Sequence, residues 1–281
     1  MKWIVTPRYS ASLLLVCFFP AAPLFGGDAE KQPANVDKSA YTIFNPTPRE
    51  QWRELSPDRP DTTESPISVD AGAYVIEASY FDWGHDDGDD TYTVMATNFK
   101  VGLSNRIDLQ TVFEAYTWEQ PQAGTGLEGF GDVTLRLKYN VWGNDGGPTA
   151  FAIFPFIKIP TGTDLSNGAT EGGLILPFST DLAEGIGLGL MAEFDAVYDE
   201  ADGDHDLEFL HSAVLGFDLT ERLGLFAEYI GIASPAPYQA YLSGGLTLSL
   251  GEDLMLDCGA KAGLNENSDD FGAFAGFTKR F

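Results

Sequence analysis

The residues that could carry hydrolytic chemistry are few. The chain has three histidines, His85, His205 and His211, and a hydrolase needs a nucleophile held beside a base. His211 alone has an adjacent serine, Ser212. Neighbouring residues of a strand point to opposite faces, so this pair is not expected to act together. The sequence also lacks a G-x-S-x-G elbow, a phosphate loop and a zinc spacing, and we predict that the protein is not an enzyme.

Two acidic stretches could instead hold a hard cation. Residues 86–90 read Asp-Asp-Gly-Asp-Asp, and residues 199–206 are also rich in Asp and Glu. Carboxylate oxygens are the ligands that Ca²⁺ and Mg²⁺ prefer, but neither stretch has the complete spacing of a calcium-binding loop. One alternative is a pair of solvated external loops, and another is bridging by divalent ions to lipopolysaccharide phosphates. We assign no metal ligand and no cofactor.

A third set of charged residues alternates with apolar residues. In residues 107–120, for example, Asp108, Gln110, Glu114 and Tyr116 share one face, and apolar side chains share the other. Since successive side chains of a strand point to opposite faces, this pattern predicts two-faced strands. If the apolar face meets lipid, the polar face lines a wet lumen. The residues that we expect in that lumen are Asp108, Glu114, Arg136, Lys138, Lys158 and Glu193.

About a dozen such segments make up most of the chain. They cover residues 74–83, 92–103, 107–120, 132–142, 149–160, 173–182, 187–198, 207–219, 223–232, 240–250, 254–264 and 271–281. Each is close to the roughly 9–11 residues that a tilted membrane strand needs. Tight turns such as 104–106 alternate with longer polar gaps such as 84–91 and 199–206, a rhythm typical of outer-membrane barrels with short periplasmic turns and longer extracellular loops.

We therefore predict an all-β fold in residues 70–281, a closed antiparallel up-and-down transmembrane barrel of about 12 strands. The alternative is a soluble lipocalin-like barrel or sandwich, in which the apolar face would point inward. Charges of both signs on the polar faces and aromatic residues near the strand ends favour lipid outside.

The first residues predict export. Lys2 and Arg8 precede the apolar run 11–19, and small residues come before a polar stretch that starts at Asp28. This order is typical of a secretory signal peptide, and the run is too short to span a bilayer. We assign residues 1–27 to the signal peptide and predict a location in the bacterial outer membrane.

The composition limits the partners. The chain carries 16 Lys and Arg against 42 Asp and Glu, a formal net charge of −26. Binding to phosphates needs basic residues, so nucleic acid is not expected. The partners that we expect are outer-membrane lipid and lipopolysaccharide, a small-molecule solute, and the barrel-insertion machinery, which would read the strand ending in Phe281. Without the signal peptide Cys258 is alone, so no intrachain disulfide is expected.

The segment between the signal peptide and the strands, residues 28–69, is polar and rich in proline, and its apolar residues do not recur at a regular spacing. Its prolines, as in residues 56–61, exclude a regular helix. One interpretation is a disordered periplasmic leader. The other is an insert in the periplasmic mouth of the barrel, where Arg59, Asp61 and Glu64 would pair with luminal charges and latch a plug.

Three motifs in order carry a resemblance to a known family. They are Arg-Pro-Asp-Thr-Thr-Glu-Ser-Pro at 59–66 followed by Gly72 and Glu77, Gly-Phe-Gly-Asp at 129–132, and Pro-Phe-Ile-Lys-Ile-Pro-Thr-Gly at 155–162. With them the chain resembles the outer-membrane transporters labelled "MetA-pathway of phenol degradation", from about residue 56 to residue 281. The resemblance implies an outer-membrane barrel that moves small organic compounds, aromatic ones among them. The phenol label is a pathway association and does not itself identify the cargo.

The function that we predict is passive passage of small solutes. A barrel of this size lies between barrels filled by side chains and wide porins, so we expect a narrow or partly plugged lumen. The alternative is a closed structural or adhesive envelope barrel that works through its acidic external loops. Packing of Phe154, Phe156 and Phe226 across the lumen would favour that alternative.

Overall fold

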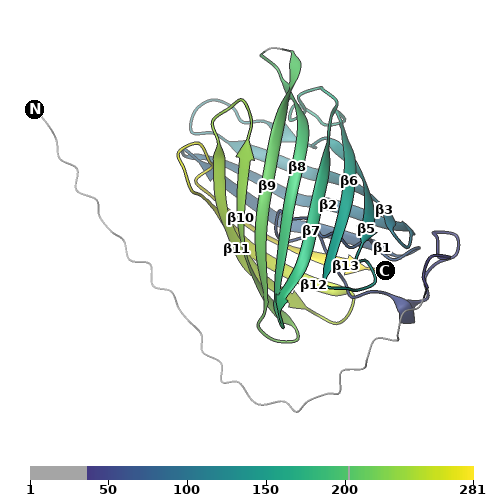
Figure 1. Ribbon diagram of the computed structural model, residues 1–281. Helices are drawn as coiled ribbons and strands as arrows, with labels where there is room; N and C mark the ends of the chain where they lie inside the picture. Colours follow the sequence, from purple (N-terminus) through teal and green to yellow (C-terminus); the bar gives the residue numbers. More distant parts are fainter. Residues whose placement is uncertain (1–36, 202) are drawn as a thin grey trace, which may run out of the picture. The chain divides into compact units, whose positions relative to one another are not determined.

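The strands of the computed structural model form one antiparallel sheet of thirteen strands that closes on itself (Figure 1). The structure describes residues 37–201 and 203–281, so the predicted signal peptide lies outside the described residues. The first strands are β1 (Tyr74–Asp86), β2 (Asp89–Ser104), β3 (Ile107–Gln120), β4 (Glu128–Gly129), β5 (Val133–Trp142) and β6 (Thr149–Ile159). They are followed by β7 (Glu171–Ala183), β8 (Ile186–Asp199), β9 (Asp204–Asp218), β10 (Leu223–Ala233), β11 (Gln239–Ser249), β12 (Leu254–Gly263) and β13 (Phe271–Arg280).

Closure comes from the pairing of the first and last long strands. β1 pairs with β2 on one edge and with β13 on the other, in a register that places Val75 opposite Arg280. The two-residue β4 pairs only with β3, and β3 continues the wall by pairing with β5. The remaining twelve strands are the staves of a closed antiparallel barrel, and the predicted fold class is confirmed.

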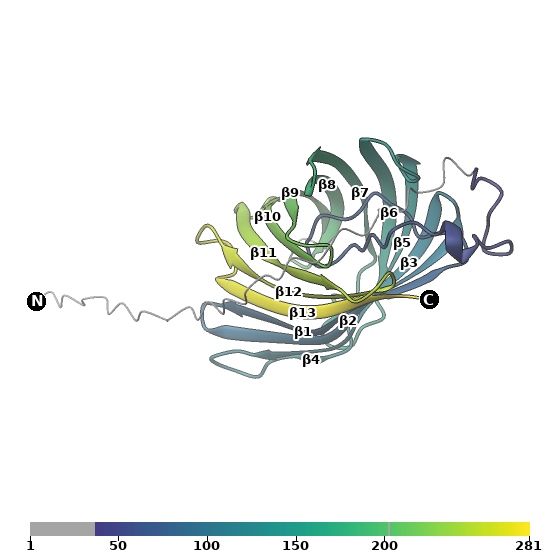
Figure 2. The same ribbon diagram turned by 90° about the horizontal axis from the view of Figure 1, so that it is seen from below.

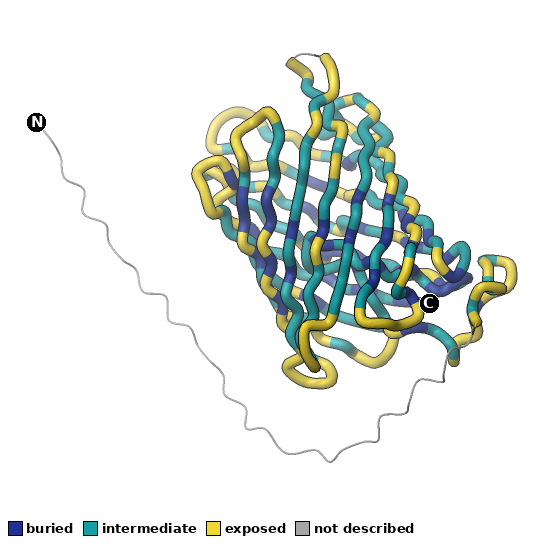
Figure 3. The backbone as a smooth tube through the Cα atoms, in the orientation of Figure 1, coloured by how far each residue is buried: buried dark blue, intermediate teal, exposed yellow. Residues whose placement is uncertain are grey.

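The two faces of the strands are inverted relative to those of a soluble β protein. Large exposed side chains on the outside include Tyr139, Ile157, Leu190, Phe194, Leu225 and Leu242. The largest fully buried side chains include Lys100, Lys138, Gln110, Glu77, Glu228 and Asn140. Burial is concentrated along the strands, and the connecting loops are exposed (Figure 3). An apolar exterior around a polar interior is the arrangement of a barrel with lipid outside, and it argues against the soluble alternative.

Two of the predicted long gaps are shorter in the structure. β1 and β2 run to Asp86 and from Asp89, so Asp87 and Gly88 alone form the turn, with φ of 48° and 91°. A two-residue hairpin turn with two positive φ values favours an Asp-Gly pair. In the same way β8 and β9 extend to Asp199 and from Asp204. The charged residues of these gaps are thus largely paired strand residues, because acidic composition alone does not end a strand.

The alternation of faces changes within β2 and β3. Strict alternation, counted back from the inward-pointing Lys100, would place Val94 inside the barrel. Met95 has a φ of 53°, and on its far side Thr93 lines the lumen instead. In β3 Thr117 points inward and hydrogen-bonds Thr93 at 2.8 Å. Tyr116, which strict alternation places on the luminal face, is 40% exposed instead. The prediction for Tyr116 is wrong because the alternation is interrupted in both strands at Met95, although the register is kept there, with Val94 opposite Tyr116 and Ala96 opposite Glu114.

The chain before β1 passes through the barrel. Its one described helix, the 3-10 turn η1 (Arg49–Gln51), precedes an irregular stretch, residues 53–69, that we call the inserted loop. Hydroxyl groups of Ser56 and Ser65 lie 2.7 Å apart, so the two limbs of this loop run side by side. Figure 2 shows this part of the chain within the ring of strands. Within the described residues, no helix is long and apolar enough to cross a membrane.

Candidate functional site

The inserted loop is fixed to one wall of the lumen by a buried ionic cluster. Lys138 Nζ of β5 lies 2.8 Å from Asp58 Oδ1, and Lys100 of β2 contacts both Asp58 and Glu77. All four side chains are between 1% and 3% exposed. The backbone N–H of Asp58 also donates to Glu77 Oε1 at 3.0 Å. Buried charges are tolerated when each one has partners, and here two lysines face two carboxylates.

The backbone of the loop finds its hydrogen-bond partners in luminal side chains. Asn140 Nδ2 donates to Pro66 O at 2.8 Å, and Lys138 Nζ donates to Ile67 O at 3.1 Å. The N–H of Val69 donates to Asp108 Oδ2 at 2.9 Å. A chain without regular structure must satisfy its peptide groups in this way when it lies inside a barrel. The positions of these polar side chains therefore determine the path of the loop.

The tip of the loop reaches the opposite wall. Glu228 of β10 accepts hydrogen bonds from the N–H groups of Thr62 and Thr63 at 2.9 and 2.8 Å, and from the Thr63 hydroxyl at 2.7 Å. The same hydroxyl lies 2.6 Å from the hydroxyl of Ser212 on β9. The loop therefore crosses the lumen.

Arg59 ties the loop to the seam of the barrel. Its Nη2 and Nε donate to Asp257 Oδ1 and Oδ2 on β12 at 2.8 and 3.2 Å. Its Nη1 donates to the hydroxyl of Ser79 on β1 at 2.6 Å. A guanidinium that binds both carboxylate oxygens forms one of the stronger side-chain contacts in proteins. Arg59 thus bridges strands on either side of β13.

At the short-turn end, Arg53 anchors the entry of the segment. Its guanidinium lies 3.1 Å from Asp70 and 2.9 Å from Asp145, which belongs to the β5–β6 turn. Burial raises the pKa of Asp145, but the hydrogen bond from Asn105 and the charge of Arg53 outweigh burial, so that this pKa lies below its ordinary value. The carboxylate is therefore ionised in the docked state over the neutral range.

A second anchor at the same end joins the segment to the last strand. The guanidinium groups of Arg49 and Arg280 both lie over the ring of Trp52, each 5.0 Å from its centroid. Arg280 Nε donates to Asp253 Oδ1 at 2.9 Å, and Arg49 also contacts Asp253. Burial raises the pKa of Asp253, but the hydrogen bonds and charges of the two arginines lower it below its ordinary value. Stacking of guanidinium groups on an indole adds to this contact.

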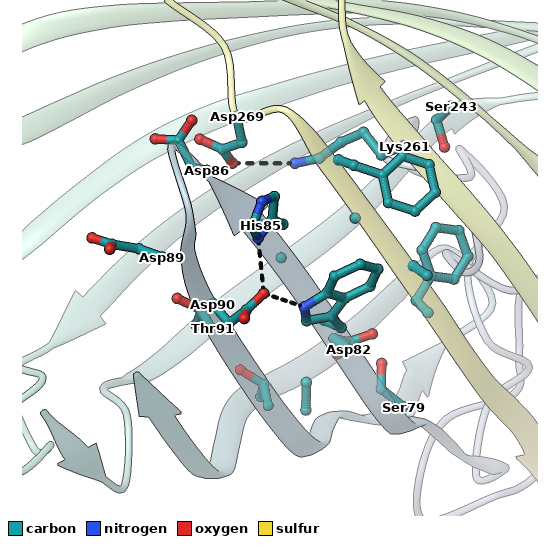
Figure 4. Close-up of a pocket in the computed structure, with 18 of the residues that line it drawn as sticks. Ser79, Asp82, His85, Asp86, Asp89, Asp90, Thr91, Ser243, Lys261 and Asp269 are labelled. Atoms are coloured by element: carbon teal, nitrogen blue, oxygen red, sulfur yellow. Dashed lines mark hydrogen bonds and ion pairs between the residues drawn. The ribbon is translucent and has the colours of Figure 1, made fainter. Parts of the chain in front are cut away.

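The inserted loop lies between two cavities of the described structure. The cavity toward the long loops has a volume of about 790 Å³ and includes Ser79, Asp82 and Lys261 in its lining (Figure 4). The cavity toward the short turns has a volume of about 760 Å³ and is lined in part by Val214 and Phe226. Arg59 and Pro60 line both cavities. These two residues therefore occupy the boundary between the two parts of the lumen.

Part of the remaining lumen is filled by apolar side chains. Phe154, Ile175 and Met191, from β6, β7 and β8, form a buried cluster with Ala152, and Phe156 packs against it. Lys138 Nζ lies 4.5 Å from the centroid of the Phe154 ring, so the cluster adjoins the ionic wall. Phe154 and Phe156 thus help to close the lumen, as the closed-barrel alternative expects. Phe226, by contrast, lines the short-turn cavity.

Three of the residues that we expected in the lumen contact the inserted loop. Asp108 accepts from Val69, Lys138 binds Asp58, and Arg136 contacts Glu64. The Glu64 contact places this member of the predicted latch beside a luminal charge.

The other expected residues form no hydrogen bond or ion pair with the loop in the described structure. Glu114 accepts from the Thr117 hydroxyl at 3.1 Å, and Lys158 contacts Glu171 near the long loops. No ion pair of Glu193 or Asp61 is found within residues 37–201 and 203–281. Asp61 lines the short-turn cavity. Of the predicted latch residues, Arg59 and Glu64 have ionic partners on the barrel, whereas Asp61 lacks one in the described structure.

Several of the residues that hold the loop are not among those predicted. Asp58, Glu77, Lys100, Glu228 and Asp257 each bind across the loop–barrel boundary or support such a contact. Apart from Asp58 they lie on strands, and their place on the polar face of the alternation was the only sign in the sequence that they point into the lumen. Their partners could not be paired from sequence, because alternation gives a face and not a neighbour.

The histidine beside a serine has no catalytic geometry. The Ser212 hydroxyl points to Thr63 in the lumen, whereas His211 Nε2 lies 3.2 Å from the Tyr238 hydroxyl. The predicted separation of the two side chains onto opposite faces is confirmed. Across the described residues, no group of three or more His, Cys, Asp or Glu side chains is arranged to hold a metal ion.

Comparison with known proteins agrees with the fold. The family model described as "Putative MetA-pathway of phenol degradation" matches residues 57–281. An outer membrane channel from Pseudomonas putida F1 is similar with a TM-score of 0.60 and 12% identity, covering 79% of this chain and 99% of that chain. The NanC porin is similar with a TM-score of 0.49 and 11% identity, covering 74% and 98% of the two chains. No curated protein matches the sequence.

At 12% identity, the similarity to the channel from Pseudomonas putida shows a shared fold and no more. A closed barrel with an apolar exterior is a structure that spans the outer membrane, because every peptide group is paired within the wall. The predicted location in the bacterial outer membrane is confirmed.

Proposed function

The chain belongs to the family described as "Putative MetA-pathway of phenol degradation", and on this premise we propose that it is an outer-membrane channel for small solutes whose own inserted loop closes the passage. The observation that carries the proposal is the shared lining of the two cavities by Arg59 and Pro60. A solute that moves from one cavity to the other must pass these two residues. We propose that passage is passive.

The contacts of the loop divide into an ionic base around Asp58 and a tip, residues 59–63, which is held by Arg59 and by the hydrogen bonds of Thr62 and Thr63 to Glu228. At the base, Asp58 is buried among Lys100, Lys138 and Glu77. Removing any one of these charges would leave another buried and unpaired, which is costly. At the tip, Arg59 is more accessible, with a side chain 18% exposed. We therefore propose that the tip moves aside during passage while the base stays docked.

The cargo that we propose is a small organic compound. A cavity of about 790 Å³ lies within the range of about 300–1,000 Å³ that small-molecule sites occupy. Phe274 and Pro60 give the long-loop cavity apolar surface beside its charged residues. The family description adds an association with phenol degradation, and aromatic compounds are accordingly the first to be tried.

A closed structural barrel is the second candidate, and the apolar cluster around Phe154 favours it. The experiment that separates the two is single-channel recording of the refolded mature chain in planar lipid bilayers, with folding checked by heat-modifiable gel mobility. Stable conductance steps are expected for the channel, with brief large openings when the tip moves. Silence from folded protein would overturn the channel and leave the structural barrel.

A further inference from the structure

The long-loop cavity is strongly acidic. Its lining includes the carboxylates of Asp82, Asp86, Asp89, Asp90, Glu119 and Asp269. The lysine and arginine residues of the lining are Arg59 and Lys261, and His85 is also present. Figure 4 shows several of these acidic side chains from different strands around the cavity.

The two strong bases of the cavity are already engaged. Arg59 is bound by Asp257 at 2.8 Å. Lys261 Nζ lies 3.9 Å from Asp269 Oδ2 and 4.4 Å from the centroid of the Tyr241 ring. Neither base therefore presents an uncompensated positive charge to a solute.

Most of the acids, by contrast, have no basic partner. Asp90 accepts from the indole N–H of Trp83 at 2.8 Å and lies 2.9 Å from His85 Nδ1. In the part of the chain that the structure describes, Asp82 and Glu119 form no salt bridge, and the same is true of Asp86 and Asp89. The cavity thus carries an excess of uncompensated negative charge.

The short-turn cavity repeats this imbalance. Its lining contains Asp61, Asp181, Glu184 and Asp218, and its single described base is again Arg59. Acidic side chains therefore lie on both sides of the boundary that a solute must cross. This arrangement differs from a single acidic patch at one surface, because the charge follows the whole proposed path.

We propose that the lumen selects small cationic solutes over anions, with Asp82 and Glu119 as specificity-determining residues. The inference rests on the proposed channel function and names its substrate class. Rings of Asp and Glu are a known means of selecting cations in pores, and a cavity lined by one sign of charge concentrates counter-ions. The ring of Phe274 in the same cavity supplies a face that attracts organic ammonium groups.

The test is the reversal potential of the folded mature chain in planar bilayers under a gradient of KCl. We expect potassium to permeate more readily than chloride by a factor on the order of ten near 0.1 M salt. The preference should fall toward unity at 1 M, because the screening length shortens from about 10 Å to about 3 Å. In choline chloride, we expect choline to carry current more readily than chloride, whereas sodium benzoate should show the preference for sodium.

Matched variants connect the preference to the cavity. Asp82→Asn and Glu119→Gln each remove one cavity charge, and each should lower the ratio of potassium to chloride permeability. Glu221→Gln removes one exposed charge of the β9–β10 turn, outside both cavity linings, and should leave the ratio unchanged. A conducting wild-type chain that prefers chloride, or variants that all behave alike, would overturn the selectivity and leave the channel standing. Silence in every salt from folded protein would overturn the channel, and the selectivity with it.

Discussion

Arg59 of the inserted loop and Asp257 of β12, 198 positions apart in the sequence, form a two-point ion pair at 2.8 and 3.2 Å. The carboxylate of Asp257 is fully buried, whereas the arginine side chain is 18% exposed. The pair therefore joins a fixed acid in the wall to a base that borders both cavities. Its position makes it the contact whose loss should most directly widen the passage.

Replacing Arg59 by alanine should raise the single-channel conductance. The substitution removes the guanidinium from the boundary of the two cavities and releases the loop from Asp257 and Ser79. Arg222→Ala is the matched control, since Arg222 lies in an exposed turn and its side chain has no described partner. Unchanged current in the Arg59 variant, with the control also unchanged, would contradict the proposed closure.

Acid should release the segment at the short-turn end. The pKa values of Asp145 and Asp253 are lowered in the folded state from a value of 3.8. A depressed carboxylate pKa stabilises the docked state above the unfolded value, and this contribution is lost as the pH falls through the folded value. Release at this end is therefore expected only below a pH of about 3.8, where large openings should become frequent.

The acid prediction has an internal control. Other luminal carboxylates also titrate in acid, so the double variant Asp145→Asn with Asp253→Asn is needed to attribute the effect. It removes the charges of Asp145 and Asp253 at pH 7, without the change of pH that would also titrate other carboxylates. The variant should show frequent openings at pH 7. If its traces match those of the wild type at pH 7, the ion pairs of Asp145 and Asp253 do not hold the segment.

The barrel could be predicted from sequence because its main signal is local. A strand of a membrane barrel alternates apolar and polar residues, and each of the twelve segments carries that pattern within itself. The prediction of inward and outward faces is wrong where a single residue interrupts the alternation. This occurs at Met95, whose φ of 53° exchanges the faces of β2. The predicted strand ends are wrong at residues 84–91, because acidic residues of a composition typical of loops are paired across a two-residue turn.

The path of the inserted loop could not be predicted in the same way. A polar, proline-rich segment has no period, and its composition suits water inside the barrel as well as outside. Only pairings between distant residues decide between these places, such as Asp58 with Lys138, 80 positions away. Neighbouring residues of the loop also differ in their surroundings. Arg59 and Thr62 bind the barrel wall, whereas the side chain of Asp61 lines a cavity.

Replacing Asp58 by asparagine should destabilise the folded chain. Asp58 is the common partner of Lys100 and Lys138, and all three side chains are at most 3% exposed. Removing one partner leaves buried positive charge uncompensated, at a cost of about 3 kcal/mol. Unfolding in urea, followed by tryptophan fluorescence in lipid vesicles, should show a lower midpoint. Asp164→Asn, at an exposed position, should change the midpoint little, and an equal effect of the two variants would contradict a structural role for the ionic cluster.

A reversible lock on the loop tests whether its tip must move. The hydroxyl groups of Thr63 and Ser212 lie 2.6 Å apart, close enough for cysteines at both positions to form a disulfide after a small adjustment. The exposed Cys258 would first be replaced by alanine. In the variant Thr63→Cys with Ser212→Cys, large openings should be absent after oxidation and should return with reductant, while Ser212→Cys alone should respond to neither treatment. Equal currents from oxidised and reduced double variant would show that solutes pass a docked tip, and the passage would then lie along the fixed loop.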